Sequence, residues 1–178
     1  MLNTIRWGIL GASKFALEQM APAIHLASGA KLAALATSSN SKALAFQSLQ
    51  ADLKIHDSYE ALLADPEIDA VYVPLPNHMH IEWTLKALDA GKHVLCEKPL
   101  AMSAADFDQV IQLRNSTGLL AAEAYMILHH PQWHKAKELY EAGGIGKLLY
   151  VDGVFTYDNH ADPDNIRNKP DTGGGSLP

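Results

Sequence analysis

The sequence predicts an α/β protein whose core is a doubly wound parallel sheet. Short aliphatic runs alternate with segments of helical character from the first residues to about residue 122, which is typical of repeated βαβ units. These runs are apolar at consecutive positions, so both faces of the expected sheet are buried. A chain of 178 residues with 48% hydrophobic and 19% charged residues is long enough to bury a substantial core.

Six strands and four helices are expected in this first region. Ser58 and Ser103 stand where helices should begin, and Gly91 and Gly118 stand where helices should end. Pro22 should begin or kink a helix, so the segment after the first strand is less regular. The expected strands are residues 5–10, 31–36, 54–56 (the weakest), 70–73, 93–96 and 119–122, and the expected helices are residues 41–49, 58–64, 80–90 and 103–113.

The pattern changes after residue 122, which divides the chain into two expected domains, residues 1–122 and 123–178. Residues 131–142 predict a helix, and residues 148–157 alternate in polarity like a long strand. The tail, residues 159–178, predicts an extended, mobile loop. One helix and one strand cannot bury a core, so this region either packs on the first domain or is the beginning of an incomplete domain.

Composition and charge exclude several classes of partner. The chain has 20 acidic and 14 basic residues, giving a net charge of −6, and the basic residues are scattered, so nucleic acid is not an expected partner. No run approaches the roughly 20 apolar residues of a membrane span, and no export signal is visible. The single cysteine, Cys96, lies within an apolar strand. We therefore expect a cytoplasmic protein without membrane contact.

The first strand leads into a turn of small residues, Gly11 to Ala16, with the pattern G-x-S-x-x-A. Glycine permits a sharp bend and the close approach of a pyrophosphate, whose charge the N–H groups of the following helix would face. Ser13 and Ala16 stand where two further glycines are usual. The turn indicates a dinucleotide site, and an ordinary strand-to-helix connection is the alternative.

The end of the second strand indicates which dinucleotide would bind. Residues 37–42 are Thr-Ser-Ser-Asn-Ser-Lys, with no carboxylate to bind a ribose 2′-hydroxyl and with hydroxyls and Lys42 to surround a 2′-phosphate. This favours NADP over NAD. A hydroxyl-rich helix cap is the alternative interpretation.

Two segments each contain more than one histidine and are therefore candidate metal sites. After the fourth strand, Asn77 can cap the next helix, while the stiff segment of residues 74–80 would border a nicotinamide. His78 and His80 have a spacing that sometimes binds metal, but no further ligand is nearby in the sequence, so no metal is expected. The group at residues 129–134, which includes Trp133, is expected to form a pocket wall.

Glu97 and Lys98 follow the fifth strand directly, where parallel sheets bind ligands. An amine held there can exchange a proton with a substrate hydroxyl. A surface ion pair between the two neighbours is the alternative. The chain shows neither a nucleophile turn with a Ser-His-Asp order nor an exposed cysteine beside histidine, which disfavours hydrolase chemistry.

Four motifs in order resemble the glucose-fructose oxidoreductase, inositol dehydrogenase and MocA (Gfo/Idh/MocA) family of NAD(P)-dependent oxidoreductases. They are residues 8–13, Pro76-Asn77-x-x-His80, Glu97-Lys98-Pro99, and Asn165-Ile166-Arg167 with residues 173–177. The resemblance covers essentially the whole chain. It implies an N-terminal Rossmann domain, residues 1–122, followed by the beginning of a C-terminal substrate and oligomerisation domain, residues 123–178, whose family fold is α/β with a large open antiparallel sheet.

The resemblance also implies roles for individual residues. Lys98 would be the catalytic lysine, and Arg167 would approach the nicotinamide or the substrate. The pyrophosphate would lie on Gly11, Ala12, Ser13, Lys14 and Phe15, the adenosine ribose or its phosphate on Thr37 and Ser38, and the rest of the cofactor along Pro76, Asn77, His80, Glu97 and Lys98.

Members of the family move a hydride between a nicotinamide cofactor and a carbon that bears a hydroxyl or carbonyl group. The leading hypothesis is therefore an NAD(P)-dependent oxidoreductase acting on a sugar, polyol or dihydrodiol, with NADP preferred to NAD and with a homo-oligomeric full-length form. The alternative is a dinucleotide-binding module, or an inactive fragment, without catalysis. A metal-dependent enzyme that uses the histidines is disfavoured.

Overall fold

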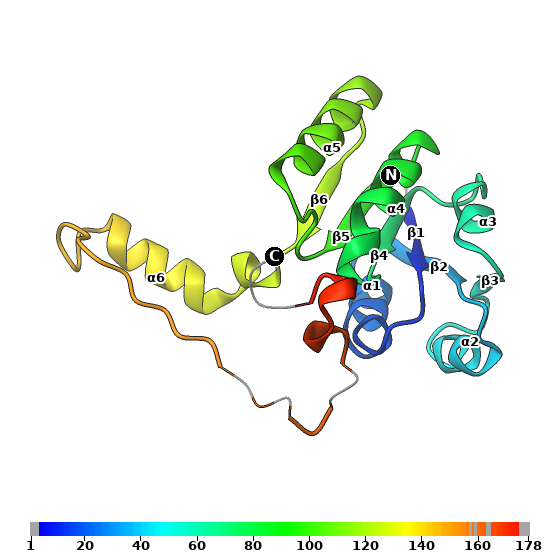
Figure 1. Cartoon of the computed structure of the whole chain (residues 1–178), viewed down its shortest axis with the longest axis horizontal. Coiled ribbons are helices and arrows are strands. Elements are labelled where there is room, and N and C mark those ends of the chain that lie inside the picture. The colour runs from blue at the N-terminus through cyan, green and yellow to red at the C-terminus, as the bar shows by residue number, and fades with distance from the viewer. Residues whose placement is uncertain (1–3, 157, 159, 163–164, 175–178) are drawn as a thin grey trace.

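Six parallel strands form one sheet in the computed structural model, which describes residues 4–156, 158, 160–162 and 165–174. The strand order is β3-β2-β1-β4-β5-β6, so the order reverses between β1 and β4 (Figure 1). The strands are β1 (Ile5–Leu10), β2 (Ala30–Ala36), β3 (Lys54–His56), β4 (Ala70–Val73), β5 (His93–Glu97) and β6 (Ala121–Ala124). The predicted parallel sheet is confirmed.

Helices cover both faces of the sheet, as a doubly wound fold requires. One buried cluster joins the strands to α3 (Tyr59–Leu63), α4 (His80–Asp89) and α5 (Ala104–Thr117). The other joins them to the π-helical turn η1 (Ala16–Met20), α1 (Ala21–Leu26) and α2 (Asn40–Gln47). Val71 and Val73 of β4 face the first cluster, whereas Tyr72 between them faces the second, because successive strand residues point to opposite faces.

The helices begin and end for local reasons that the sequence predicted. The Ser58 hydroxyl oxygen accepts a hydrogen bond from Ala61 N (3.1 Å), and that of Ser103 accepts one from Asp106 N (3.2 Å). Gly118 ends α5 in the left-handed conformation, with φ +70°. Pro22 lies in the first turn of α1, directly after η1, where a residue without an N–H is tolerated.

The boundary between α5 and β6 lies further along the chain than predicted. The helix runs to Thr117 and the strand to Ala124, so the expected strand 119–122 begins and ends two residues too early. The Ser116 and Thr117 hydroxyls donate to Leu113 O (2.9 and 2.8 Å). These polar side chains are thereby satisfied within the helix, which continues past the predicted end at residue 113 to Thr117.

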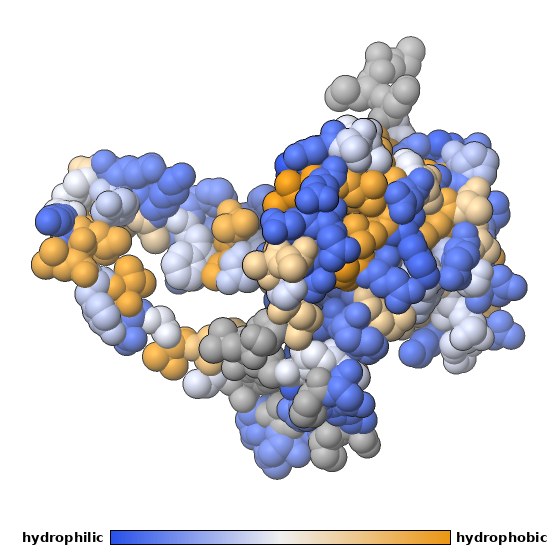
Figure 2. All heavy atoms as spheres, turned by 45° about the horizontal axis from the view of Figure 1, so that its top comes forward, coloured by the Kyte–Doolittle hydropathy of each residue, from blue (hydrophilic) through white to orange (hydrophobic). Residues whose placement is uncertain are grey.

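The expected strand at residues 148–157 is wrong. Its described residues, 148–156, belong to no sheet, and Leu149 and Phe155 are 83% and 88% exposed. A strand requires pairing with a neighbouring strand, and residues 148–156 are not part of the sheet that β1 to β6 form. We call residues 126–156 the arm, which contains the turn η3 (Met126–His129) and α6 (Pro131–Glu141). The arm extends away from the sheet in Figure 1 and carries exposed hydrophobic residues in Figure 2.

The tail is not the extended loop that the sequence suggested. Its described residues form two 3-10 turns, η4 (Ile166–Asn168) and η5 (Pro170–Thr172), joined by hydrogen bonds from the Thr172 hydroxyl to Ile166 O (2.7 Å) and Lys169 O (2.9 Å). Asn77 Nδ2 donates to Gly173 O (2.8 Å), which holds the tail beside the turn η2 (Asn77–Met79). Residues 159, 163–164 and 175–178 of the predicted tail lie outside the described residues.

Within the described part of the chain, no helix has the length and apolar character needed to cross a membrane.

Candidate functional site

The predicted site residues lie at one edge of the sheet. All strands run in the same direction, so the segments that follow β1, β2, β4 and β5 emerge together at the carboxyl edge. Because β4 alone separates β1 from β5, these two strands, which lead to the Gly11 turn and to Lys98, lie roughly 10 Å apart in the sheet. The strand order reverses between β1 and β4, and such reversals form the ligand crevice of open α/β sheets.

Gly11 has a conformation and surroundings that other residues cannot share. Its φ is +92°, and a Cβ at this position would lie 2.8 Å from Leu75 Cδ2 and 3.2 Å from the Tyr59 hydroxyl oxygen. Its N–H donates to Ala36 O at the end of β2 (3.0 Å). The turn therefore requires glycine both for its backbone conformation and for its close packing.

Ser13 begins the helical segment that follows the turn. Its hydroxyl oxygen accepts from Ala16 N (3.1 Å), and its carbonyl accepts from Leu17 N (3.1 Å). Residues 14–26 are then continuously helical. The N-terminus of this segment, with the backbone of Lys14 and Phe15, lies at the carboxyl edge, and its dipole favours an anion there.

Thr37 and Ser38 line a cavity of about 210 Å³ at the ends of β2 and β3. The expected cap interpretation also holds in part, because the Ser39 hydroxyl oxygen accepts from Lys42 N (3.4 Å) at the start of α2. The remaining lining residues are Asp57, Ser58, Tyr59 and Glu60, whereas Lys42 is not among the residues that line it. The ionisable groups of the cavity are thus acidic.

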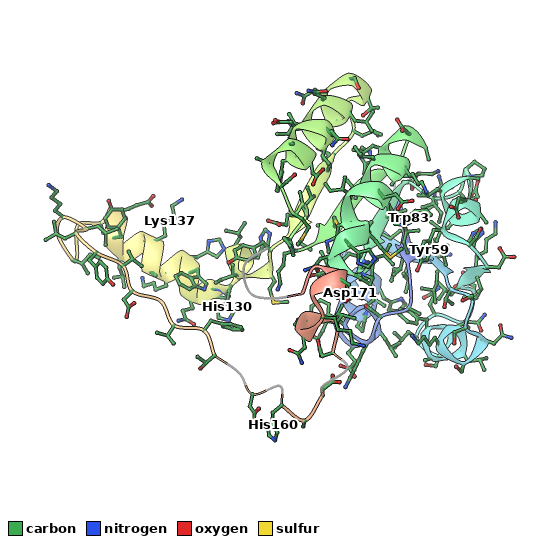
Figure 3. All side chains as sticks on the ribbon, viewed as in Figure 1. Tyr59, Trp83, His130, Lys137, His160 and Asp171 are labelled. Carbon is green, nitrogen blue, oxygen red and sulfur yellow. The ribbon has the colours of Figure 1, made fainter. Side chains whose placement is uncertain are left out.

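Tyr59 connects this cavity with the Gly11 turn. Its hydroxyl lies beside Gly11, and its ring packs edge-on against Trp83, with the ring centroids 4.8 Å apart. Figure 3 labels both residues, which lie side by side. The Lys86 amine lies 4.1 Å from the centre of the Trp83 ring. Burial raises the pKa of Tyr59, so its hydroxyl is a neutral hydrogen-bonding group at ordinary pH. Sequence reasoning missed Asp57 to Glu60, although they follow the third predicted strand and hence reach the same edge.

Glu97 is fixed by a buried tyrosine. The hydroxyl of Tyr72, which is 0% exposed, donates to Glu97 Oε1 (2.6 Å), while Lys98 N donates to Glu97 Oε2 (3.3 Å). Burial, together with the Glu97 carboxylate, raises the pKa of Tyr72, which keeps the hydroxyl protonated. The ion pairs formed by the described residues do not include the Lys98 amine, so the alternative of a Glu97–Lys98 surface pair is not observed.

The segment after Lys98 is anchored from two sides. The Lys98–Pro99 peptide bond is cis, Pro99 O lies 2.6 Å from His80 Nδ1, and Leu100 N donates to Glu123 Oε1 (2.8 Å). Lys98 itself is exposed. The structure thus presents a solvent-facing amine on a fixed piece of backbone.

Cys96 lies just before Glu97 and is fully buried, and burial raises the pKa of its thiol to about 12. It is an unreactive core residue in this environment.

The sequence suggested that Asn77 caps α4, but in the structure it does not. It lies in η2, its amide reaches Gly173, and the helix begins at His80 without a side-chain cap. Pro76 precedes it at the same edge. Arg167 lies in η4, next to the turn that contacts η2, so the tail brings it toward this edge.

The second histidine group is not brought into a pocket wall. His130 Nδ1 accepts from Gln132 N (3.1 Å) and caps α6, and Trp133 is 52% exposed on that helix. Figure 3 places His130 at the start of α6, on the arm. Among the described residues, no group of three His, Cys, Asp or Glu side chains is arranged to hold a metal ion.

The glycine turn, the helix N-terminus, the neighbouring cavity and the lysine after β5 share the edge where the strand order reverses. This arrangement defines a dinucleotide-binding Rossmann domain. A family model described as "Oxidoreductase family, NAD-binding Rossmann fold" matches residues 5–125. The chain belongs to this family, the Gfo/Idh/MocA oxidoreductases, as the four sequence motifs indicated.

Individual relatives support the assignment. An uncharacterized oxidoreductase of Rhizobium meliloti is 41% identical over 99% of the chain and 52% of its own length. A dTDP-3,4-didehydro-2,6-dideoxy-alpha-D-glucose 3-reductase of Saccharopolyspora spinosa is 39% identical over 99% of the chain and 53% of its length. The chain thus spans about half the length of the curated relatives it matches.

A solved structure has the same fold. It is a 3-ketoreductase from Actinomadura kijaniata in complex with NADP and TDP-benzene, which is 35% identical and superposes with a TM-score of 0.75. The match covers 79% of the chain and 43% of that protein.

Proposed function

We propose that the whole protein is an NADP-dependent oxidoreductase that moves a hydride between the nicotinamide and a sugar or polyol carbon bearing a hydroxyl or carbonyl group. The observation that carries the proposal is the shared edge: the Gly11 turn and the exposed Lys98 flank the point where the strand order reverses. A dinucleotide lying across this edge would place its pyrophosphate at the Gly11 turn and its nicotinamide near Lys98.

The residues at the edge fit a dinucleotide. Gly11 allows the turn its positive φ and its close packing against Leu75 and Tyr59, and the N-terminus of the helical segment that follows favours the pyrophosphate. Thr37 and Ser38 would hold the adenosine ribose, while Pro76, Asn77 and Glu97 would border the nicotinamide, with Arg167 approaching from the tail.

NADP is supported by the cofactor of the Actinomadura 3-ketoreductase. The carboxylates of Asp57 and Glu60, which line the cavity, can accept hydrogen bonds from ribose hydroxyls. NAD, whose adenosine ribose carries a free 2′-hydroxyl, is therefore the second candidate cofactor.

Lys98 Nζ is the proposed proton carrier. When bound, the nicotinamide supplies or accepts the hydride. During reduction the Lys98 ammonium gives its proton to the carbonyl oxygen, which becomes the hydroxyl of the product, and during oxidation the neutral amine removes that proton. Tyr72 and Glu97 hold the preceding backbone so that this amine stays at the edge.

The substrate class is proposed from the relatives, whose names include a reductase of a dTDP-linked sugar. Residues 123–178 would begin the substrate and oligomerisation domain, although β6, which extends to Ala124, shows that the sheet includes the first residues of that range. The exposed hydrophobic residues of the arm, such as Leu149 and Phe155, support further contacts in a homo-oligomeric full-length protein. Cytoplasm is the proposed location, supported by the single buried cysteine.

A dinucleotide-binding module without catalysis is the second candidate, favoured by the six-stranded sheet whose carboxyl edge carries the glycine turn and the cavity at Thr37 and Ser38. To test both, NADPH and NADH are titrated by fluorescence, and a panel of sugars, polyols and dihydrodiols is then assayed with the chain and with a full-length form. Saturable NADPH binding with turnover of a sugar or polyol is expected. Binding without turnover in the full-length form would favour the module, and absence of binding would refute both.

A further inference from the structure

His80 is the first residue of α4, and its side chain is 1% exposed. Both ring nitrogens face backbone carbonyl oxygens: Nδ1 lies 2.6 Å from Pro99 O, and Nε2 lies 2.7 Å from Leu75 O. A carbonyl oxygen only accepts hydrogen bonds, so hydrogen bonds to both carbonyls require a proton on each ring nitrogen, which only the doubly protonated ring has. Both ring nitrogens thus face backbone groups, whereas the family resemblance implied that His80 lines the cofactor.

The two carbonyls belong to different functional segments. Leu75 follows β4 and precedes Pro76 and Asn77, whereas Pro99 follows β5 and Lys98. The strands β4 and β5 are neighbours in the sheet. His80 consequently joins the segment proposed to border the nicotinamide to the segment that carries the proposed proton carrier.

We propose that His80 is a positioning residue that holds Lys98 in place through the hydrogen bond from Nδ1 to Pro99 O. This inference rests on the proposed function of Lys98. The backbone on either side of the Lys98 side chain is then fixed: Lys98 N by Glu97 Oε2 (3.3 Å) and Pro99 O by His80 (2.6 Å). The hydrogen bond from Leu100 N to Glu123 holds the next residue. The hydrogen bond from Nε2 separately holds the Leu75 carbonyl.

The two hydrogen bonds can be removed separately by substitution. The side-chain amide nitrogen of asparagine lies where Nδ1 lies in histidine, and the side-chain amide nitrogen of glutamine lies where Nε2 lies. His80→Asn keeps a donor for Pro99 O, and His80→Gln keeps a donor for Leu75 O. The matched controls are His78→Asn and His78→Gln, since His78 is exposed in the adjoining turn. In the full-length form, His80→Gln should lower kcat about 100-fold and His80→Asn about threefold, with little change in KM or NADPH affinity.

A readout that needs no turnover uses the ligand-free chain. Amide NMR signals of Lys98 and Leu100 should shift in His80→Gln and stay in place in His80→Asn, and the signal of Asn77 should behave in the opposite way. Nitrogen NMR of the wild-type ring should show a proton on Nδ1. This measurement requires no variant, so it tests the proposal even if both substitutions prevent folding.

An Nδ1 without a proton would overturn the proposal. So would equal losses of turnover and of Tm in the two His80 variants, because that result would show a packing role only. If the wild type bound no NADPH, the proposed function would fail, while the amide shifts would still show whether His80 anchors the Lys98 segment.

Discussion

The two edges of the sheet use charged residues in opposite ways. At the amino edge, Arg6 binds the Asp69 carboxylate through two nitrogens (2.9 and 2.7 Å) and also pairs with Glu67 (2.7 Å). The buried Lys92 amine donates to Asp65 O (2.7 Å) and Ile68 O (2.8 Å). The hydrogen bonds from Arg6 hold the pKa of the Asp69 carboxyl below its usual range, and burial lowers the pKa of Lys92.

At the carboxyl edge, by contrast, the Lys98 amine is exposed and has no carboxylate partner among the described residues. Charged groups at the amino edge thus hold the strands together, whereas those at the carboxyl edge remain available to bind a ligand. Substitutions at the amino edge should therefore change stability, and those at the carboxyl edge should change binding and turnover.

The largest expected effect is that of Lys98→Met on turnover. Loss of a positioned proton carrier lowers turnover about 100-fold to 10,000-fold, whereas NADPH affinity and Tm should change little because the side chain is exposed. Steady-state kinetics of the full-length form and a fluorescence titration measure the two quantities. Lys147→Met, at another exposed lysine, is the control, and unchanged turnover in Lys98→Met would remove this residue from the reaction.

Gly11→Ala should weaken both cofactor binding and folding. The positive φ and the 2.8 Å contact with Leu75 Cδ2 make a methyl group cost about 1–3 kcal/mol. Urea unfolding and an NADPH titration of the same sample measure the two losses. Gly29→Ala is the matched control, because Gly29 also has positive φ (+78°) but no neighbour within 4 Å of a Cβ. Equal losses in both variants would show that packing at the turn is unimportant.

Lys92→Met should affect stability alone. The substitution keeps the apolar stem and leaves two carbonyl groups without their donor, which costs about 1–3 kcal/mol of unfolding free energy. Denaturant unfolding measures this loss. NADPH affinity should stay within about twofold of the wild type, and a large loss of affinity at unchanged stability would contradict the division between the two edges.

Acid should weaken the fold through Asp65. Hydrogen bonds from Lys54 (2.8 Å) and other donors lower the pKa of this buried carboxyl from 3.8 to about 2. A depressed pKa contributes stability that is complete above the unfolded value and is lost as the pH falls from about 4 to about 2. The loss should be about 1–2 kcal/mol, reduced by the solvent around the exposed Lys54. Asp65→Asn should remove this part of the pH dependence, and an unchanged profile would contradict it.

Local patterns predicted most of the sheet. Residues 5–10, 54–56 and 70–73 were placed with the observed bounds. Residues 70–73 are apolar and buried throughout, as expected of a strand covered on both faces, whereas residues 54–56 form a short, partly exposed strand at the edge of the sheet. Residues 148–157 were misassigned because an alternating pattern states a preference, whereas pairing depends on distant residues.

The candidate site divides in the same way. Gly11, Thr37, Ser38 and Lys98 follow strands and could be assigned to the edge from the strand direction alone. The contacts from Tyr59 to Gly11, from Tyr72 to Glu97 and from His80 to Pro99 join segments far apart in the chain. Such contacts become visible only when the packing is known.

The most direct test of the central claim, that a nicotinamide dinucleotide lies across the carboxyl edge between Gly11 and Lys98, is an NADPH titration of the isotope-labelled chain followed by amide NMR. We expect saturable shifts in the amide signals of residues 11–15, Thr37, Ser38 and Lys98. The amide signals of Arg6, Asp69 and Lys92 should not change. Saturable shifts confined to the amino edge, or to the separate cavity that Phe107, Val110 and Ala121 help to line between α5 and β6, would contradict it.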